Sequence, residues 1–313
     1  MALLIHLTDR DQSGWAAALR EKLGKFPVYL SSEKFDPAEI TYALVWKPAP
    51  TTFDGLTRLK AILSLGAGVD GLLRHPNLPD VPIVRFVDEE LSQCMSDYVV
   101  ANVSMHQRLF TQFKLDQFAR RWVQHYPAAA TTLSVGLMGL GVIGAHTAKA
   151  LIALGYEVRG WSRTRKDLPG VACFAGELEF GAFLAETDIL VNLLPLTPET
   201  EGILNYETFG QLRRERLKGG PAVINAARGG HQREADLIKA LTDGTLGAAS
   251  LDVFEVEPLP PESRLWTMPN CYITPHIAAI SNERTGVSYF SKVIRDHERG
   301  RPLPNLVDRN RGY

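Results

Sequence analysis

Short apolar runs alternate with stretches of helical periodicity along almost the whole chain. In order, the apolar runs read ALLIHL, VYLS, YALVWK, AILSLG and VPIVRF near the start, then LSVGLM, EVRGWS, DILVNLL, AVINAA, GAASLDVF and CYITPH. Near-continuous apolar strands separated by helices predict parallel sheets that are covered on both faces. Two series of strands predict an α/β protein with two doubly wound parallel-sheet domains.

The segment between the two series predicts how the domains are joined. Residues 91–122 contain no Pro or Gly and have helical periodicity, so we expect one continuous helix that leaves the first domain. Residues 281–300 have helical spacing too, and we expect this last helix to return to the first domain. The first domain is therefore predicted to be discontinuous, with residues 1–98 and 283–313 flanking a second domain of residues 99–282.

Composition narrows the class of protein. Of 313 residues, 45% are hydrophobic and 22% charged, and the net charge of −1 gives no general attraction for nucleic acid or an anionic membrane. Cys94, Cys173 and Cys271 form no CxxC pair and indicate reduced, packed thiols. The N-terminal apolar run is too short for a signal peptide, and residues 133–156 read as strand, turn and helix rather than a membrane span. We expect a cytoplasmic protein that binds neither nucleic acid nor membrane.

The stretch GLGVIG is the most specific motif. Gly139, Gly141 and Gly144 follow an apolar strand and open an amphipathic helix at Val142 and Ile143, and the strand EVRGWS follows at the spacing of one βαβ unit. Such glycines permit a tight turn, let backbone amides approach a pyrophosphate and let helix and strand pack closely. The alternative is a tight strand–helix turn without a ligand.

The end of the strand EVRGWS indicates which dinucleotide binds. An NAD site usually has Asp or Glu there to hold the ribose 2′-hydroxyl. This chain has Ser162 instead, followed by Arg163, Arg165 and Lys166. Cations without a carboxylate suit a 2′-phosphate, so we expect NADP(H) to be preferred and NAD(H) to be possible. The alternative is a solvated basic turn.

Polar residues follow three of the later strands. Arg228 follows AVINAA, Asp252 follows GAASL with Glu257 beyond it, and His276 follows CYITP. Open α/β sheets bind ligands at the carboxyl ends of their strands. Arg228 suits a substrate carboxylate, and Glu257 suits a hydrogen bond that fixes the tautomer of His276 and stabilises its protonated form.

This set is what reduction of a 2-oxo acid requires, because a hydride reaches the carbonyl carbon while a proton reaches its oxygen. An unassisted imidazole is mostly neutral at pH 7, so a carboxylate partner is needed to keep the imidazole protonated and able to act as the acid. His231 has no evident carboxylate partner, and we interpret it as a loop or helix-cap residue. No grouping of His, Cys and carboxylates has metal-ligand spacing, so no catalytic metal is predicted.

The motifs GLGVIG, NLLPLTPET, INAARGG, DVFEVEP and TPHIAA, in this order, resemble those of the D-isomer-specific 2-hydroxyacid dehydrogenases over nearly the whole chain. LSLGAGVDG, VPIVRFVDEELSQCMSDYV and VDRNRGY are most similar to the branch that reduces glyoxylate and hydroxypyruvate. The sequence GGHQREADL departs from the family, where Val or Ile followed by Asp-Glu is frequent, and this leaves the start of the next helix uncertain.

The resemblance implies a Rossmann dinucleotide-binding domain inserted into a flavodoxin-like substrate domain, and it implies roles for these residues. Arg228 would bind the substrate carboxylate and keto oxygen, His276 would be the acid/base with Glu257 as its partner, and Asp252 would contact the carboxamide side of the nicotinamide. Further cofactor contacts are implied for Leu194, Pro195 and Ala226.

The resemblance also implies a substrate-binding loop in the first domain. Its backbone amides would bind the substrate carboxylate, and a run of small residues makes a suitable anion nest. The residues concerned are Leu65, Gly66, Ala67 and Gly68. Trp46 would line the substrate pocket, and the alternative for it is ordinary packing at a strand end.

The leading hypothesis is therefore an NADPH-preferring reductase that converts glyoxylate to glycolate and hydroxypyruvate to D-glycerate. The alternatives are a dehydrogenase of the same fold for another 2-oxo acid, formate or phosphite, or a nucleotide-sensing binding protein like the co-repressors of this fold. A Glu–His pair disfavours formate, because the related formate enzymes resemble a Gln–His arrangement. We also expect a homodimer through residues 91–126, since the family dimerises there and the region is rich in aromatic residues: Phe110, Phe113, Phe118, Trp122 and Tyr126.

Overall fold

The chain divides into two compact units, each described here by itself. The computed structural model describes residues 1–66 and 68–312. Unit 1 comprises Met1–Leu91 and Ser281–Tyr313, and unit 2 comprises Ser92–Ile280. Unit 1 is thus discontinuous in sequence.

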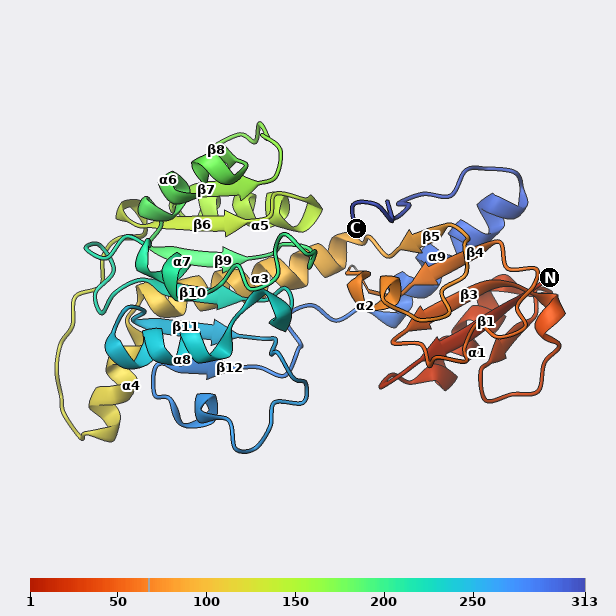
Figure 1. The fold of residues 1–313 in the computed structure, drawn as a ribbon, viewed down its shortest axis with the longest axis horizontal. Helices are drawn as coiled ribbons and strands as arrows, with labels where there is room; N and C mark the ends of the chain where they lie inside the picture. Colours follow the sequence, from red (N-terminus) through yellow and green to blue (C-terminus); the bar gives the residue numbers. More distant parts are fainter. Residues whose placement is uncertain (67, 313) are drawn as a thin grey trace. The chain divides into compact units, whose positions relative to one another are not determined.

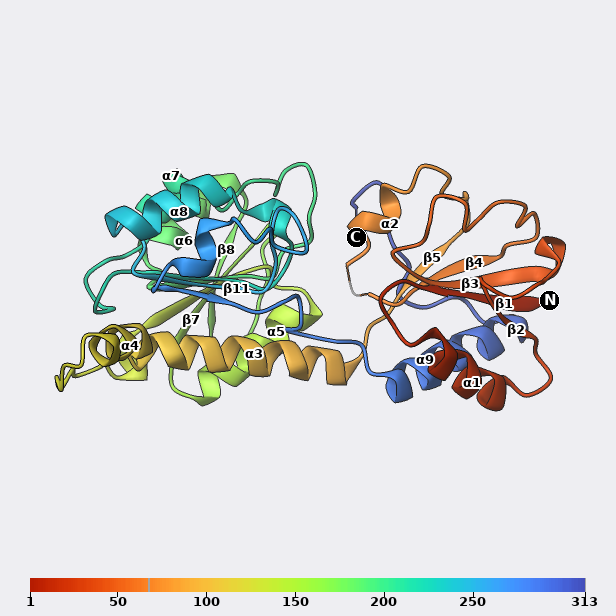
Figure 2. The ribbon, with the colours of Figure 1, turned by 90° about the horizontal axis from the view of Figure 1, so that it is seen from below.

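Unit 1 is built on a parallel sheet. Five strands run in the order β2-β1-β3-β4-β5 within the described residues, which is the flavodoxin-like order of a doubly wound fold. The strands are β1 (Ala2–Leu7), β2 (Val28–Leu30), β3 (Ile40–Trp46), β4 (Ala61–Ser64) and β5 (Ile83–Arg85). The helices are α1 (Gln12–Leu23), α2 (Asp70–Leu73) and α9 (Glu283–Glu298). Figure 2 shows α1 and α9 on one face of this sheet and α2 on the other.

Alternation along the strands of unit 1 divides its core between the two faces. Leu3 and Ile5 of β1 pack with Trp15 of α1 and Phe290 of α9. Leu4, between them, packs into the cluster on the opposite face. Successive residues of a strand point to opposite faces of the sheet, and both faces are covered. Residues on both sides of these strands are therefore buried, which explains why the strands read as continuous apolar runs.

Unit 2, all of whose residues are described, contains a seven-stranded parallel sheet in the order β12-β11-β10-β9-β6-β7-β8. Its strands are β6 (Ser134–Met138), β7 (Glu157–Ser162), β8 (Val171–Ala175), β9 (Ile189–Asn192), β10 (Ala222–Asn225), β11 (Ala248–Leu251) and β12 (Cys271–Ile273). The first three strands run outward from β6 in one direction and the last four in the other (Figure 1), which is the Rossmann order. The expected fold class is confirmed in both units.

The edge strand β8 was not predicted. Its sequence VACFA is a short apolar run, and its side chains are mostly half-buried, with Ala172 exposed. A short apolar run does not by itself distinguish a strand from a buried helical segment, and the pairing with β7 decides that it is a strand.

Helices cover both faces of the sheet in unit 2. They are α3 (Glu89–Gln107), α4 (Phe110–Phe118), α5 (Val142–Ala153), α6 (Phe180–Ala185), α7 (Tyr206–Gly210) and α8 (Glu234–Asp243). The core cluster of α3 and α5 includes Val99, Leu137 and Leu151, while Phe183 and Leu237 belong to the cluster under α6, α7 and α8 (Figure 2). No helix in the described part of the chain is long and apolar enough to cross a membrane.

The expected continuous helix over residues 91–122 is wrong. α3 ends at Gln107 and α4 at Phe118, and between the two helices Leu109 adopts a left-handed conformation with φ 62°. Leu109 is only 3% exposed, so the break places an apolar side chain in the interior that a straight helix would point elsewhere. The expected domain boundary after residue 98 falls inside α3, whereas the units of the structure separate near its start.

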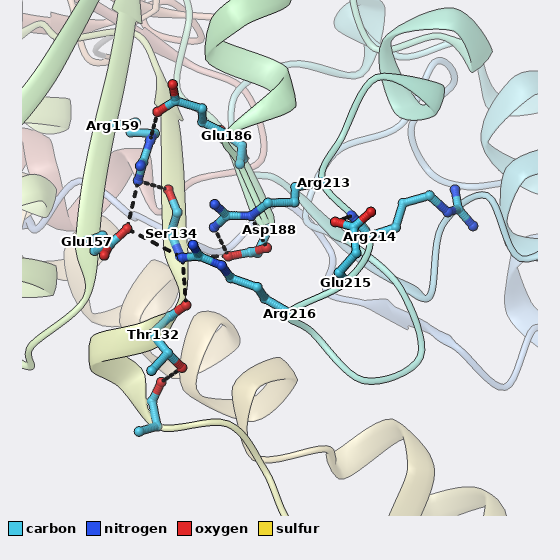
Figure 3. A network of polar contacts seen from close by, with 12 residues as sticks. Thr132, Ser134, Glu157, Arg159, Glu186, Asp188, Arg213, Arg214, Glu215 and Arg216 are labelled. Atoms are coloured by element: carbon cyan, nitrogen blue, oxygen red, sulfur yellow. Dashed lines mark hydrogen bonds and ion pairs between the residues drawn. The ribbon is translucent and has the colours of Figure 1, made fainter.

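The amino-terminal edge of the seven-stranded sheet carries a cluster of ion pairs (Figure 3). Asp188, fully buried before β9, accepts hydrogen bonds from the backbone N–H of Ser134 at 2.8 Å and from Nε of Arg213 at 2.8 Å. Arg159 of β7 binds the Ser134 hydroxyl and pairs with Glu157 at 3.2 Å. The cluster therefore ties together the starts of β6, β7 and β9.

Candidate active site

The last paired residues of neighbouring strands in unit 2 form a row, and this row marks the carboxyl edge of the sheet. Across the sheet the pairs are Met138 with Asn192, Asn192 with Asn225, Asn225 with Leu251, and Leu251 with Ile273. The candidate residues that follow this row within three positions are Gly139, Gly141, Leu194, Pro195, Ala226, Arg228, Asp252 and His276. The parallel register therefore places residues from distant parts of the sequence at one edge.

The glycine-rich turn between β6 and α5 has little space for side chains. Gly139 has φ +102°, and a Cβ there would lie 2.8 Å from the carbonyl oxygen of Leu193. A Cβ on Gly144 would lie 1.9 Å from the Gly139 oxygen, so helix and turn are in direct backbone contact. At Gly141 no atom lies within 4 Å of a built Cβ, and no side chain caps the first turn of α5. The turn thus leaves helix amides open toward a space that an anion could fill.

The residues after β7 differ in burial and partners. Ser162 is buried, and its hydroxyl donates a hydrogen bond to a backbone carbonyl two residues later at 2.9 Å. The guanidinium of Arg165 is bound to a carbonyl of β8 and to Glu179. Arg163 and Lys166 are both exposed, and the charge of Arg163 acts on Glu199. The turn after β7 therefore presents exposed cations at its surface.

Glu257 and His276 are in direct contact. Nδ1 of His276 lies 2.8 Å from Oε2 of Glu257, and the side chains are 33% and 29% exposed. The other carboxylate oxygen, Oε1, accepts a hydrogen bond from the backbone N–H of Phe254 at 3.1 Å, which fixes the carboxylate. Because Nδ1 faces the carboxylate, Nε2 is the nitrogen left for other partners.

Asp252 organises the turn that carries His276. The carboxylate is 1% exposed and accepts hydrogen bonds from the N–H groups of Ile277 and Ala278, both at 2.9 Å, and from the hydroxyl of Thr274 at 2.6 Å. The backbone N–H of His276 donates to the Asp252 carbonyl oxygen at 2.8 Å. His276 has φ 55°, a conformation that costs free energy and that these bonds hold in place.

Arg228 lies on a loop packed against the end of β11. A Cβ on the neighbouring Gly229 would lie 1.7 Å from the carbonyl oxygen of Phe254, so only glycine fits there. The Arg228 side chain is half-buried, and Nη1 donates to the Ala227 oxygen at 2.8 Å.

His231 is a buried loop residue in a short 3₁₀ helix, Gly229–His231. Nδ1 lies 3.1 Å from the carbonyl oxygen of Arg228, and Nε2 lies 3.2 Å from that of Pro195. The ring therefore joins the loops after β9 and β10, and its burial rules out contact with bulk solvent.

In unit 1 the structure brings Trp46 and the glycine-rich loop together. A Cβ on Gly66 would lie 2.3 Å from Cζ3 of the Trp46 ring, so the indole packs directly on this loop. The Leu65 carbonyl accepts a hydrogen bond from the hydroxyl of Ser281 at 2.9 Å. Gly68 is half-buried, and Ala67 lies outside the described residues.

A family model matches residues 100–278, described as the NAD binding domain of D-isomer specific 2-hydroxyacid dehydrogenases. A glyoxylate/hydroxypyruvate reductase A from Escherichia fergusonii is 42% identical over 320 residues, with both chains covered completely. The chain belongs to the D-isomer specific 2-hydroxyacid dehydrogenase family. The resemblance stated from the sequence is confirmed.

Solved structures of this dehydrogenase family match over the same length. An NADPH-dependent glyoxylate/hydroxypyruvate reductase from Sinorhizobium meliloti, in complex with NADP and sulfate, gives a TM-score of 0.95 at 42% identity, with 100% of both chains covered. A D-isomer specific 2-hydroxyacid dehydrogenase from Xanthobacter autotrophicus Py2, in complex with NADPH and MES, gives 0.94 at 42% identity, covering 100% of this chain and 99% of that one.

Sequence reasoning missed three buried amides of this dehydrogenase. Asn192, Asn225 and Gln232 are at most 2% exposed and hydrogen-bond to one another at the ends of β9 and β10. The available signal was a polar residue at the end of an apolar strand, as at Asn192 and Asn225. Within the described residues, no group of three or more His, Cys, Asp or Glu side chains is placed to hold a metal ion.

Proposed function

We propose that this chain is an NADPH-preferring reductase of small 2-oxo acids that converts glyoxylate to glycolate and hydroxypyruvate to D-glycerate. The observation that carries the proposal is the 2.8 Å contact between His276 and Glu257 at the carboxyl edge that also bears Arg228. The full-length similarity to reductases named for these two substrates supports the same substrate class.

In the proposed mechanism His276 delivers the proton. Glu257 stabilises the imidazolium through Nδ1, so the proton to be transferred is the one on Nε2. Arg228 binds the substrate carboxylate and polarises the keto oxygen, and a bound nicotinamide supplies the hydride to the carbonyl carbon. After transfer the imidazole is neutral and Glu257 remains a carboxylate. The imidazole is then the base for the reverse reaction.

The residues at the glycine turn suit a dinucleotide. The open space at Gly141 and the uncapped first turn of α5 would take a pyrophosphate, and the exposed Arg163 and Lys166 would take a 2′-phosphate. Two related structures carry NADP or NADPH, which supports the preference. The proposed contacts also include Gly139, Val142, Ile143, Gly144, Ser162, Arg165, Leu194, Pro195, Ala226 and Asp252.

On the substrate side, we propose that backbone amides of Leu65, Gly66 and Gly68 bind the carboxylate. Trp46 shapes this loop, because its ring fills the space beside Gly66. Small residues let consecutive amides point at one anion.

The decisive experiment is a turnover assay that follows the absorbance of NADPH. Glyoxylate and hydroxypyruvate should oxidise NADPH, while formate and phosphite should not reduce NADP. Absence of turnover with all four substrates, with NADPH binding intact by fluorescence titration, would contradict a reductase and favour a nucleotide-sensing protein.

A second experiment tests the cofactor preference. The double variant Arg163→Gln/Lys166→Gln should raise the KM for NADPH about tenfold and leave the KM for NADH nearly unchanged, because only NADPH carries the 2′-phosphate. Lys292→Gln is the control, since this cation of α9 is 77% exposed and belongs to unit 1, and it should change neither KM. Equal effects of the double variant on both cofactors would refute the assignment.

We further propose a cytoplasmic homodimer that associates through residues 91–126. Trp122, Tyr126 and Phe118 there are 96%, 81% and 76% exposed. The same segment contributes His106, Leu109 and Leu115 to the lining of a groove of about 630 Å³. Trp122→Glu should convert the dimer to a monomer in light scattering, whereas Leu178→Glu, 99% exposed elsewhere in unit 2, should not.

A further inference from the structure

The three buried amides form a directional chain. Nδ2 of Asn192 donates to Oδ1 of Asn225 at 3.0 Å, and Nδ2 of Asn225 donates to Oε1 of Gln232 at 2.9 Å. Nε2 of Gln232 then donates to the carbonyl oxygen of Val253 at 3.1 Å. Each amide donates a hydrogen bond to the next, and the chain ends at the carbonyl oxygen of the residue that follows Asp252.

The amide of Asn225 is saturated. Its oxygen also accepts from the backbone N–H of Ala227 at 3.2 Å, and its nitrogen also donates to the carbonyl oxygen of Arg228 at 3.1 Å. Two acceptor and two donor sites are therefore all in use, and turning the amide over would set donor against donor at Asn192. The orientation of the whole chain is fixed by this one side chain.

The chain joins the three loops that carry the proposed site. At its first end, Oδ1 of Asn192 accepts from the N–H of Leu194 at 3.2 Å. In the middle it holds the Arg228 carbonyl, which also accepts from the N–H of His231 at 3.2 Å. The three loops follow β9, β10 and β11, which lie side by side in the sheet.

We propose that Asn192, Asn225 and Gln232 are positioning residues that fix the backbone of Arg228 and thereby set the affinity for the substrate carboxylate. The inference rests on the proposed function of Arg228. A long guanidinium side chain binds a carboxylate bidentately only from a fixed base, because small displacements at its backbone are carried to its tip. The amide chain holds Arg228 through its backbone carbonyl oxygen.

The test compares two variants of Gln232. Gln232→Met keeps the volume but removes the acceptor for Asn225 and the donor for Val253, and it should raise the KM for glyoxylate about tenfold with a smaller change in kcat. Gln232→Glu should show the same defect near pH 8 and recover as the pH falls toward about 6. A buried carboxyl protonates readily, and its neutral form again accepts from Asn225 and donates to Val253.

Glu234 is the charged neighbour that needs a control. Glu234 hydrogen-bonds to Gln232 and burial raises its pKa, so both substitutions of Gln232 also change the surroundings of Glu234. Glu234→Gln, made alone and together with Gln232→Glu, shows how much of the pH dependence comes from Glu234. Thr208→Val, which removes the 2.7 Å hydrogen bond from the hydroxyl of Thr208 in α7 to the carbonyl oxygen of Ile203, is the control for lost stability alone. It should lower the Tm without changing the KM.

Binding of oxalate, an unreactive carboxylate, separates this inference from the proposed function. If the wild type binds oxalate but does not reduce glyoxylate, weaker oxalate binding by Gln232→Met still supports positioning of Arg228. Wild-type oxalate affinity and KM in folded Gln232→Met would overturn the inference, as would a pH-independent defect in Gln232→Glu. If Gln232→Met does not fold, Asn192→Ser, which breaks the first link, provides the same comparison.

Discussion

The two edges of the seven-stranded sheet differ in how their charged side chains are paired and exposed. At the amino-terminal edge, Asp188 is fully buried and paired with Arg213, and neighbouring charges close on one another (Figure 3). At the carboxyl edge, the buried groups include neutral amides such as Asn225 and the hydrogen-bonded carboxylate of Asp252, and the pair Glu257–His276 stays about one-third exposed. A buried ion pair with Asp188 thus stabilises one edge, whereas the ion pair at the other edge remains accessible to a substrate.

This difference indicates which ion pairs we expect to contribute to stability and which to catalysis. A buried, fully hydrogen-bonded ion pair has no spare capacity for a ligand, but removing one partner leaves an uncompensated charge. A half-exposed pair contributes little to stability, while its remaining nitrogen can exchange a proton. Substitutions at the amino-terminal edge should therefore affect folding, and substitutions at the carboxyl edge should affect turnover.

The largest expected effect comes from His276→Asn. Asparagine tolerates the left-handed backbone at φ 55° but cannot deliver a proton, so kcat should fall about 10³-fold at unchanged Tm. Steady-state kinetics and thermal unfolding of the same sample check both parts. A residual kcat within about tenfold of the wild type would show that another group supplies the proton.

At the other edge, Asp188→Asn should lower the free energy of unfolding by about 3 kcal/mol, because it leaves the Arg213 guanidinium without its carboxylate. Urea denaturation measures the loss, and kcat at ambient temperature should stay within about twofold. Glu186→Gln, which breaks the exposed pair with Arg159, is the control and should cost less than about 1 kcal/mol. A large loss of kcat in folded Asp188→Asn would remove the distinction between the edges.

A histidine that is enclosed should couple pH to stability. Burial lowers the pKa of His106 from 6.5 to about 4. Between these values the unfolded chain binds a proton that the folded chain does not, so stability falls as the pH drops from 7 to 5, by about 2 kcal/mol for this group. Denaturation of His106→Gln at both pH values should show a pH dependence weaker by that amount, and an unchanged dependence would assign it to other groups.

The smallest of these effects concerns Glu257→Gln. Without the carboxylate, Nδ1 of His276 loses the partner that holds the ring in place, so kcat for glyoxylate reduction should fall about tenfold at unchanged Tm. Steady-state kinetics measure the loss, and a kcat equal to that of the wild type would mean that Glu257 does not position the proton donor.

Much of this architecture was predictable from local patterns. The apolar runs predicted the parallel strands, because burial on both faces requires apolar residues on both. The spacing of Gly139, Gly141 and Gly144 predicted the strand–turn–helix unit, and the turn has the close backbone contacts that those glycines permit. The contact between Glu257 and His276 followed from their places after neighbouring strands.

Other features left no local signal. Helical periodicity continues through Leu109, and only packing of its side chain in the interior makes the left-handed break favourable. The apolar run of β8 is too short to be assigned by itself, and its pairing with β7 decides that it is a strand. Asn225 reads as an ordinary polar residue, because its hydrogen bonds to Asn192 of β9 and to the loop after β10 form only in the folded sheet.

The sequence by itself determined the fold class, the family and the candidate chemical groups, since periodicity, glycine spacing and residue type are local properties of the chain. Tertiary structure decided which of those groups meet and which are already occupied. It bound Arg165 to Glu179, enclosed His231 between two carbonyl oxygens, and fixed Arg228 on a chain of amides. The reason is physical: a hydrogen bond depends on position and desolvation, and both are set only when the strands align.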